Sequence, residues 1–229
     1  MGDEGKRAAG HAAAELVESG MRLGLGTGST VAHFLEAVAA RGLDVVGVST
    51  SEATAAQCRE LGIALLDPTE VERLDLAVDG ADELDGELNL TKGGGGALLR
   101  EKVVASLADR FVVIATPEKV VDRLADSFAL PVEVVPFALG PVRRRLGELG
   151  FDVDERTTAE GGTYRTDNGN AILDCRMTGG LEDPAVTDVT VALLPGVCET
   201  GLFIDLADLA LLGADDGSVE QLQVPTQPA

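Results

Sequence analysis

A glycine-rich segment, Lys92-Gly93-Gly94-Gly95-Gly96, stands directly before a stretch with helical spacing. Four consecutive glycines fit poorly into a helix or a strand, because glycine loses the most conformational freedom on ordering. The run therefore predicts a loop whose backbone N–H groups, with the positive end of the following helix, can stabilise an anion. We expect that helix to span residues 97–107, with Leu99, Val103 and Leu107 as its apolar side.

Glu101 lies one turn into this predicted helix. Its neighbours one turn away are apolar, namely Ala97, Leu98, Val104 and Ala105. A partly desolvated carboxylate has a raised pKa, which suits it to act as a general base. The alternative is an exposed glutamate at the edge of an amphipathic helix, with no role in chemistry.

A second glycine-rich loop, Gly26-Thr27-Gly28-Ser29-Thr30, joins a predicted strand at 21–25 to a helix that continues to about residue 40. Such a turn can hold a phosphate. Ser29 takes the place of the third glycine of a dinucleotide-binding loop, and the next strand, 44–48, is followed by Ser49-Thr50-Ser51 instead of an acid. The hydroxyls therefore favour a phosphate monoester; the structural alternative is a Ser/Thr helix cap.

Carboxylates gather after the predicted strand 74–78, in the segment Asp79-Gly80-Ala81-Asp82-Glu83. Ligand chemistry in parallel α/β sheets occurs at the carboxyl ends of strands. Clustered carboxylates need a cation or a shared proton, and the candidate cations are Lys92 and a divalent metal. The alternative is an ordinary acidic loop on a very acidic protein. Lys119 follows the strand 111–115 in the same way, so we expect both loops, Asp79 and Lys119 to meet at one edge of the sheet.

The composition describes an acidic globular protein of 229 residues, with 45% hydrophobic and 3% aromatic residues and a net charge of −21. That charge argues against nucleic acid and against anionic membrane surfaces as partners. With only four lysines, the dispersed acidity suggests a salt-rich cytosol. Three widely spaced cysteines, no signal peptide and no membrane-length apolar run predict a cytoplasmic protein.

The pattern changes near residue 130. Strands are expected at 131–135, 151–155, 163–166, 171–175 and 197–204, with helices at 139–149 and 183–194 and an Asn-Gly turn at 168–169. This β-α-β-β-α-β order is ferredoxin-like. We therefore predict an α/β protein: a Rossmann-like parallel-sheet catalytic domain, 1–129 and 206–229, with a smaller inserted α+β domain, 130–205, that could serve assembly.

Together these residues supply a phosphate cradle, a carboxylate cluster, a lysine on a glycine loop and a desolvated glutamate. They resemble the signatures of the type A ribose-5-phosphate isomerases. The matching segments, in the same order over nearly the whole chain, are 26–30, 79–83, 92–95, 100–102, 166–170, 195–197 and 201–203.

The resemblance implies interconversion of ribose 5-phosphate and ribulose 5-phosphate through an enediolate, in the non-oxidative pentose phosphate pathway, with no metal or other cofactor. It implies Glu101 as the base, Lys92 with the glycine amides as oxyanion stabiliser, and Asp79 as an aid to ring opening. The implied substrate contacts are Thr27, Gly28, Ser29, Thr30, Asp79, Gly80, Ala81, Asp82, Lys92, Gly93, Gly94, Gly95 and Lys119, with Lys6 as a weaker candidate for a phosphate contact. The family also implies a homodimer or homotetramer.

Three other hypotheses remain open on the sequence. The first is a sugar-phosphate sensor without catalysis, which would not require Glu101. The second is a metal-dependent enzyme that uses Asp79, Asp82 and Glu83. The third is a related sugar-phosphate isomerase or an acyl-CoA transferase.

Overall fold

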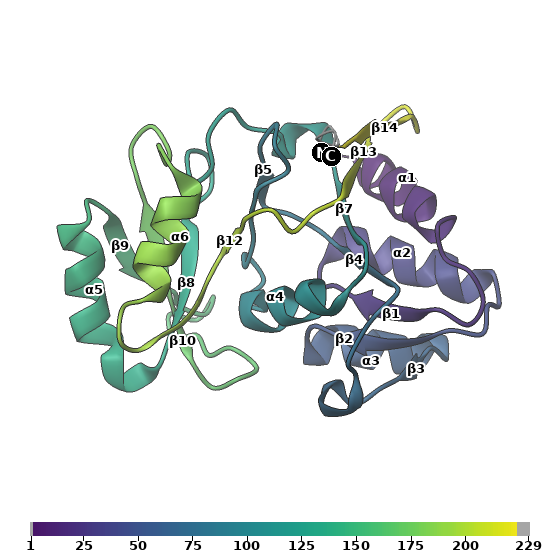
Figure 1. The fold of residues 1–229 in the computed structure, drawn as a ribbon, viewed down its shortest axis with the longest axis horizontal. Helices are drawn as coiled ribbons and strands as arrows, with labels where there is room; N and C mark the ends of the chain where they lie inside the picture. The colour runs from purple at the N-terminus through teal and green to yellow at the C-terminus, as the bar shows by residue number, and fades with distance from the viewer. Residues whose placement is uncertain (1, 224–229) are drawn as a thin grey trace, which may run out of the picture.

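Two sheets occupy opposite ends of the long axis in the computed structural model, which describes residues 2–223 (Figure 1). The larger sheet has seven strands in the order β14-β13-β7-β4-β1-β2-β3, and every pair is parallel except β13 with β14. Its strands are β1 (Arg22–Leu25), β2 (Val46–Ser49), β3 (Ala64–Leu65), β4 (Leu76–Asp79), β7 (Phe111–Ala115), β13 (Leu209–Gly213) and β14 (Val219–Leu222).

Helices cover both faces of this sheet. Three of them, α1 (Asp3–Ala14), α2 (Ser29–Ala40) and α3 (Glu52–Leu61), contribute to one apolar core, while α4 (Leu98–Leu107) contributes to the core on the other face. Alternate residues of β4 enter the two cores, with Leu76 and Val78 in the first and Ala77 in the second. The next alternate position on the α4 side is Asp79, so the strand pattern itself aims this carboxylate toward α4.

The second sheet has four antiparallel strands in the order β11-β8-β10-β9. They are β8 (Leu130–Val134), β9 (Asp152–Glu155), β10 (Ala171–Arg176) and β11 (Val197–Thr200), and α5 (Leu139–Glu148) and α6 (Pro184–Ala192) pack against them. This arrangement confirms the ferredoxin-like order of elements.

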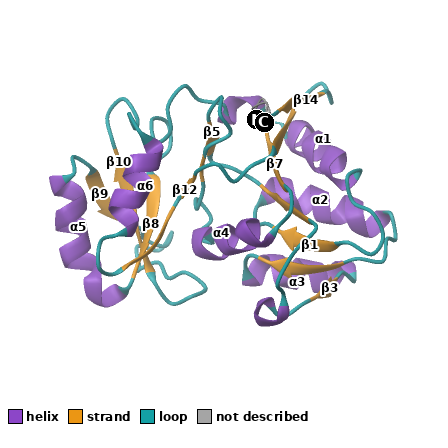
Figure 2. Ribbon diagram, in the orientation of Figure 1, coloured by secondary structure: helices purple, strands orange, loops and turns teal. Residues whose placement is uncertain are grey.

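A small third sheet lies between the two larger ones and contains β5 (Glu83–Leu84), β6 (Leu90–Thr91) and β12 (Leu202–Phe203) (Figure 2). Short 3-10 helices occupy Pro68–Glu70, Pro117–Lys119 and Pro136–Ala138. Because β12 pairs with β6, the chain returning from β11 runs directly beside the start of the glycine loop at Lys92.

The division into a catalytic domain and an insert of residues 130–205 stays a prediction. The strands of the seven-stranded sheet all lie outside 130–205, and the four-stranded sheet lies wholly within it. One strand of the predicted insert, β12, pairs outside it. Residues 224–229, which the prediction assigns to the catalytic domain, lie outside the described part of the chain.

Some expectations were wrong in detail. The apolar side predicted for α4 is incorrect, because Val103 is 46% exposed, whereas Leu98, Glu101 and Ala105 are buried. The strand expected at 163–166 is absent from the described chain apart from one bridge between Thr157 and Thr163. Its residues instead satisfy distant groups: the Thr166 hydroxyl, for example, donates to Glu133 over 2.9 Å.

Helix α1 ends at Ala14, and β13 starts at Leu209. Strands β5, β6 and β14 were not predicted. No helix in residues 2–223 has the length and hydropathy needed to cross a membrane.

Candidate active site

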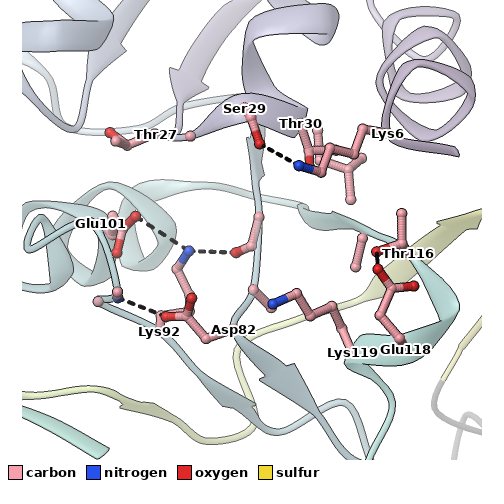
Figure 3. A pocket seen from close by; sticks show the side chains of 18 residues that line it. Lys6, Thr27, Ser29, Thr30, Asp82, Lys92, Glu101, Thr116, Glu118 and Lys119 are labelled. Atoms are coloured by element: carbon pink, nitrogen blue, oxygen red, sulfur yellow. Dashed lines mark hydrogen bonds and ion pairs between the residues drawn. The ribbon is translucent and has the colours of Figure 1, made fainter. Parts of the chain in front are cut away.

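A cavity of about 260 Å³ opens at the carboxyl ends of β1, β4 and β7, where the sequence predicts the catalytic and binding residues (Figure 3). Its walls are Lys6, Thr27, Gly28, Ser29, Thr30, Gly80, Ala81, Asp82, Lys92, Gly93, Gly94, Gly95, Glu101, Ile114, Ala115, Thr116, Glu118 and Lys119. Every predicted site residue except Asp79 lines it. Three of the four lysines in the chain also line it, beside the three carboxylates of Asp82, Glu101 and Glu118.

Lys92 sits at the centre of a buried charge cluster. Its Nζ lies 3.1 Å from Asp79 Oδ2 and 3.4 Å from Glu101 Oε1, and it donates to the Gly80 carbonyl over 2.5 Å. The exposed fractions of the three side chains are only 3%, 5% and 7%. Lys92 is therefore the cation that the clustered carboxylates required.

Burial and charge act in opposite directions on these groups. Burial lowers the pKa of Lys92, but Asp79, Glu101 and Asp82 raise it by more, so its pKa stays above the ordinary value and the ammonium is retained. Burial raises the pKa of Glu101 to about 8, although the nearby Lys92 lowers it. Glu101 Oε2 has no hydrogen-bond partner within residues 2–223, so one carboxylate oxygen is free to take a proton.

Asp79 lies behind the cavity wall. Its Oδ1 accepts hydrogen bonds from the N–H groups of Thr27, at 3.0 Å, and Gly80, at 2.7 Å. A Cβ at Gly26 would lie 2.2 Å from the same oxygen, so only glycine lets the Thr27 loop approach so closely. Asp79 thus connects the glycine-rich loop 26–30 to Lys92 without itself facing the cavity.

Asp82 supports the glycine loop from the cavity side. Its Oδ2 accepts a hydrogen bond of 2.7 Å from Gly94 N–H. The turn at Gly80 thus brings both Asp79 and Asp82 to the lysine and the glycine loop, as expected from the sequence.

The hydroxyl of Thr27 points away from the cavity. It forms hydrogen bonds with the hydroxyls of Thr50 at 2.7 Å, Ser51 at 2.8 Å and Thr54 at 3.1 Å. Its expected direct contact with a ligand is therefore limited to its backbone. The sequence missed this hydroxyl cluster, because its members follow a different strand, β2, and meet Thr27 only in the fold.

Ser29 and Thr30 begin α2 beside Lys6, and Lys119 lines the same cavity on the side of Glu118 (Figure 3). Lys6 Nζ donates to Ser29 Oγ over 2.9 Å. A helix start next to a lysine is well suited to an anion. The sequence missed Thr116 and Glu118 as wall residues, although both directly follow β7, where strand-end chemistry is expected.

Glu83 does not join the other two carboxylates of its segment. It is fully buried, and its carboxylate accepts the N–H groups of Ala125, Ser127 and Phe128. Within residues 2–223, no group of three or more His, Cys, Asp or Glu side chains has a metal-binding arrangement. The site proposed for a metal at Asp79, Asp82 and Glu83 is therefore not formed by these residues.

Comparison with known proteins gives the same family across the chain. Residues 46–217 match the family model for ribose 5-phosphate isomerase A (phosphoriboisomerase A). A ribose-5-phosphate isomerase A of Caulobacter vibrioides (strain NA1000 / CB15N) is 50% identical over 222 residues, covering 95% of this chain and 97% of that protein. One from Parvibaculum lavamentivorans is 45% identical over 225 residues, covering 94% and 96%.

Solved structures agree. Ribose 5-phosphate isomerase A from Methanocaldococcus jannaschii has a TM-score of 0.90 at 37% identity, covering 95% of this chain and 97% of that chain. A D-ribose-5-phosphate isomerase in complex with phospho-erythronic acid has a TM-score of 0.93 at 36% identity, covering 97% and 100%. With matching sequence and matching fold over almost its entire length, this chain belongs to the ribose 5-phosphate isomerase A family.

Proposed function

We propose that the chain interconverts D-ribose 5-phosphate and D-ribulose 5-phosphate, an aldose-ketose isomerisation of the non-oxidative pentose phosphate pathway. The observation that supports this function most directly is the environment of Glu101. Its buried carboxylate lies on the cavity wall, its Oε1 lies 3.4 Å from Lys92 Nζ, and its Oε2 has no hydrogen-bond partner among residues 2–223. Family membership and the solved relative bound to phospho-erythronic acid support the same substrate class.

The proton moves between two neighbouring carbons of the open-chain sugar. Glu101 removes the proton from C2, and the electron pair forms an enediolate with the carbonyl oxygen at C1. The proton of the C2 hydroxyl passes to O1, and Glu101 returns its proton to C1, which leaves a ketone at C2. No atom is gained or lost, and the pKa of about 8 for Glu101 lets it both accept and return the proton.

The other wall residues divide between charge stabilisation and binding. Lys92 and the N–H groups of Gly93 and Gly95 stabilise the enediolate oxygens. The N–H group of Gly94, which the resemblance also implied for this role, donates instead to Asp82. Ser29, Thr30, Lys6 and Lys119 hold the phosphate, with the backbone of Thr27 and Gly28.

On the opposite wall, Asp82, Gly80 and Ala81 contact the sugar. Asp79 assists ring opening through Lys92, whose ammonium it holds at 3.1 Å.

The test is turnover of ribose 5-phosphate in EDTA at increasing KCl. We expect activity to persist in EDTA, because the proposed chemistry uses only side chains and backbone amides. Molar KCl should raise the activity, since a chain of net charge −21 repels the substrate dianion until salt screens it. Unphosphorylated ribose is the control and should react far more slowly.

Two outcomes of this assay would contradict the proposal. Binding of ribose 5-phosphate without turnover would favour the sensor. Activity that EDTA abolishes and a divalent cation restores would favour the metal-dependent enzyme.

We also propose a cytoplasmic homodimer or homotetramer. Large apolar side chains of the short helix Pro136–Ala138 and of the α6 region are exposed, with Phe137 97%, Leu193 77% and Val186 60% accessible, and exposed apolar surface suits an interface. The cysteines Cys58, Cys175 and Cys198 are free thiols, which suits a reducing compartment. Light scattering should give two or four times the chain mass of 23.6 kDa, whereas a monomer at micromolar concentration would contradict the assembly.

A further inference from the structure

The glycine loop is held from behind by an arginine that does not line the cavity. Arg156 directly follows β9 of the four-stranded sheet, and its side chain is 13% exposed. One of its nitrogens, Nη1, donates to the carbonyls of Gly93 at 2.7 Å and Gly94 at 3.0 Å. Both hydrogens of that nitrogen thus form hydrogen bonds with two successive peptide groups of the loop.

The guanidinium itself is fixed in place. Its Nε donates to Asp174 Oδ2 over 2.9 Å, and its Nη2 donates to the other oxygen of the same carboxylate. The ring of Tyr164 lies 5.8 Å from the guanidinium carbon, and the Tyr164 hydroxyl donates to the Gly95 carbonyl over 3.1 Å. Three successive loop carbonyls therefore accept hydrogen bonds from the segment that joins β9 to β10.

This arrangement determines where the loop N–H groups point. In a trans peptide the C=O and the N–H of one plane point in opposite directions. Pinning the carbonyls of Gly93 and Gly94 therefore turns the N–H groups of Gly94 and Gly95 away from Arg156. Gly94 N–H then reaches Asp82 on the cavity wall, at 2.7 Å, and Gly95 lies beside it on the same wall.

The charge of Arg156 adds a second effect. A charge-assisted hydrogen bond polarises the peptide that accepts it and strengthens the donor at the other end of the plane. We propose that Arg156 is a positioning residue for the oxyanion-stabilising N–H group of Gly95 and for the neighbouring hydrogen bond from Gly94 N–H to Asp82, a role that rests on the isomerase function proposed above. Arginine is needed because a lysine ammonium cannot span Asp174 and two carbonyls in one plane.

The experiment compares Arg156→Gln, Arg156→Lys and Arg176→Gln with the wild-type chain. Arg176 is a matched control, since it pairs with Asp154 at 3.0 Å on the same sheet but contacts neither loop nor cavity. For each variant, kcat and KM are measured with ribose 5-phosphate, together with competitive inhibition by phospho-erythronic acid and by inorganic phosphate. Phospho-erythronic acid carries a carboxylate that tests the oxyanion site, whereas inorganic phosphate tests the phosphate end.

For Arg156→Gln we expect kcat to fall about 10- to 100-fold, less than the loss on deleting an oxyanion donor, because the amides are displaced and not removed. Inhibition by phospho-erythronic acid should weaken in parallel with kcat, while KM and inhibition by phosphate stay within about twofold. Arg156→Lys should recover part of the loss, and Arg176→Gln should match the wild type.

The proposal is overturned if Arg156→Gln keeps the wild-type kcat. It is equally overturned if KM and phosphate inhibition change as much as kcat, since that indicates general loosening of the pocket, or if Arg156→Lys is fully active, since charge alone then suffices. A wild-type chain that does not isomerise ribose 5-phosphate would instead refute the underlying function and this role with it.

Discussion

Replacing Glu101 by glutamine is expected to lower kcat by about 10²- to 10⁴-fold, the range for loss of a positioned general base. Glutamine keeps the size of the side chain and can still accept from Lys92, but it cannot take the C2 proton. Affinity for phosphate should change little, because the phosphate end of the cavity is formed by other elements. The measurement is steady-state turnover of ribose 5-phosphate beside inhibition by inorganic phosphate.

The matched control is Glu60→Gln, which removes one negative charge from an exposed position of α3. It should retain wild-type kcat. If Glu101→Gln remained near wild-type activity while Glu60→Gln did the same, another group would have to be the base.

Glu101 also makes the stability of the fold depend on pH. Its pKa rises from 4.5 to about 8 on folding, chiefly through burial. Between these values the folded chain holds a proton that the unfolded chain has released, so this group's contribution to stability is lost as pH rises toward 8. Glutamine cannot ionise, so Glu101→Gln should gain stability relative to wild type from pH 5 to pH 8, measured by urea unfolding. Over the same range wild-type kcat/KM should rise as the base ionises.

Local sequence pattern was enough to place most of the site. In a parallel sheet the carboxyl ends of neighbouring strands share an edge, so Thr27, Asp79 and Lys119 could be predicted to meet from the strands before them. The bounds of β7 also match the predicted 111–115. These elements are specified by nearby residues, namely caps, apolar runs and glycines.

The failures share a different cause: each depends on a long-range contact. Periodicity alone cannot choose between the stripe of Leu99 and Val103 and the adjacent stripe of Leu98 and Ala105, because both are apolar. Packing determines which stripe is buried. Because the ionisable residue Glu101 interrupts the buried stripe, that stripe looks less apolar in the sequence than it is in the fold. A carboxylate within an otherwise apolar buried stripe is the pattern that marks the functional residue.

The contact of Arg156 with the glycine loop also could not be predicted from the sequence. It lies more than 60 positions from the glycines that it contacts, and nothing in its neighbourhood distinguishes it from the other arginines. The prediction that the Thr27 hydroxyl faces the ligand was wrong for the same reason, since its partner Thr54 comes from another βα unit. Sequence therefore predicts which side chains reach the site, but not what holds them there.

Replacing Lys92 by methionine is expected to have the second large effect, on both rate and stability. The substitution removes the only cationic side chain that pairs with Asp79 and Glu101 within residues 2–223, and both carboxylates are at least nine-tenths buried. Breaking a buried pair by removing one partner costs about 3–5 kcal/mol, because a charge is left uncompensated. The lost oxyanion donor should lower kcat by about 10²- to 10³-fold. Urea unfolding and steady-state kinetics measure the two effects separately.

A second substitution separates the causes. In the Lys92→Met background, Asp79→Asn removes the unpaired carboxylate and should restore part of the stability without restoring kcat. The control is Lys102→Met: Lys102 also lies over the Phe203 ring, at 5.2 Å against 5.5 Å for Lys92, and pairs with Glu199 at 2.6 Å, but it is not on the cavity wall. It should lose stability with little loss of kcat.

Lys92 also lowers the pKa of Glu101, so without it the acid should ionise at still higher pH. In the pH profile of kcat/KM, the rising limb of Lys92→Met should therefore lie at higher pH than that of the wild type. If the limb does not move while kcat falls, Lys92 stabilises the enediolate but does not tune the base. If neither kcat nor the limb changes, the charge cluster is structural, and the oxyanion must be held by the glycine amides that Arg156 positions.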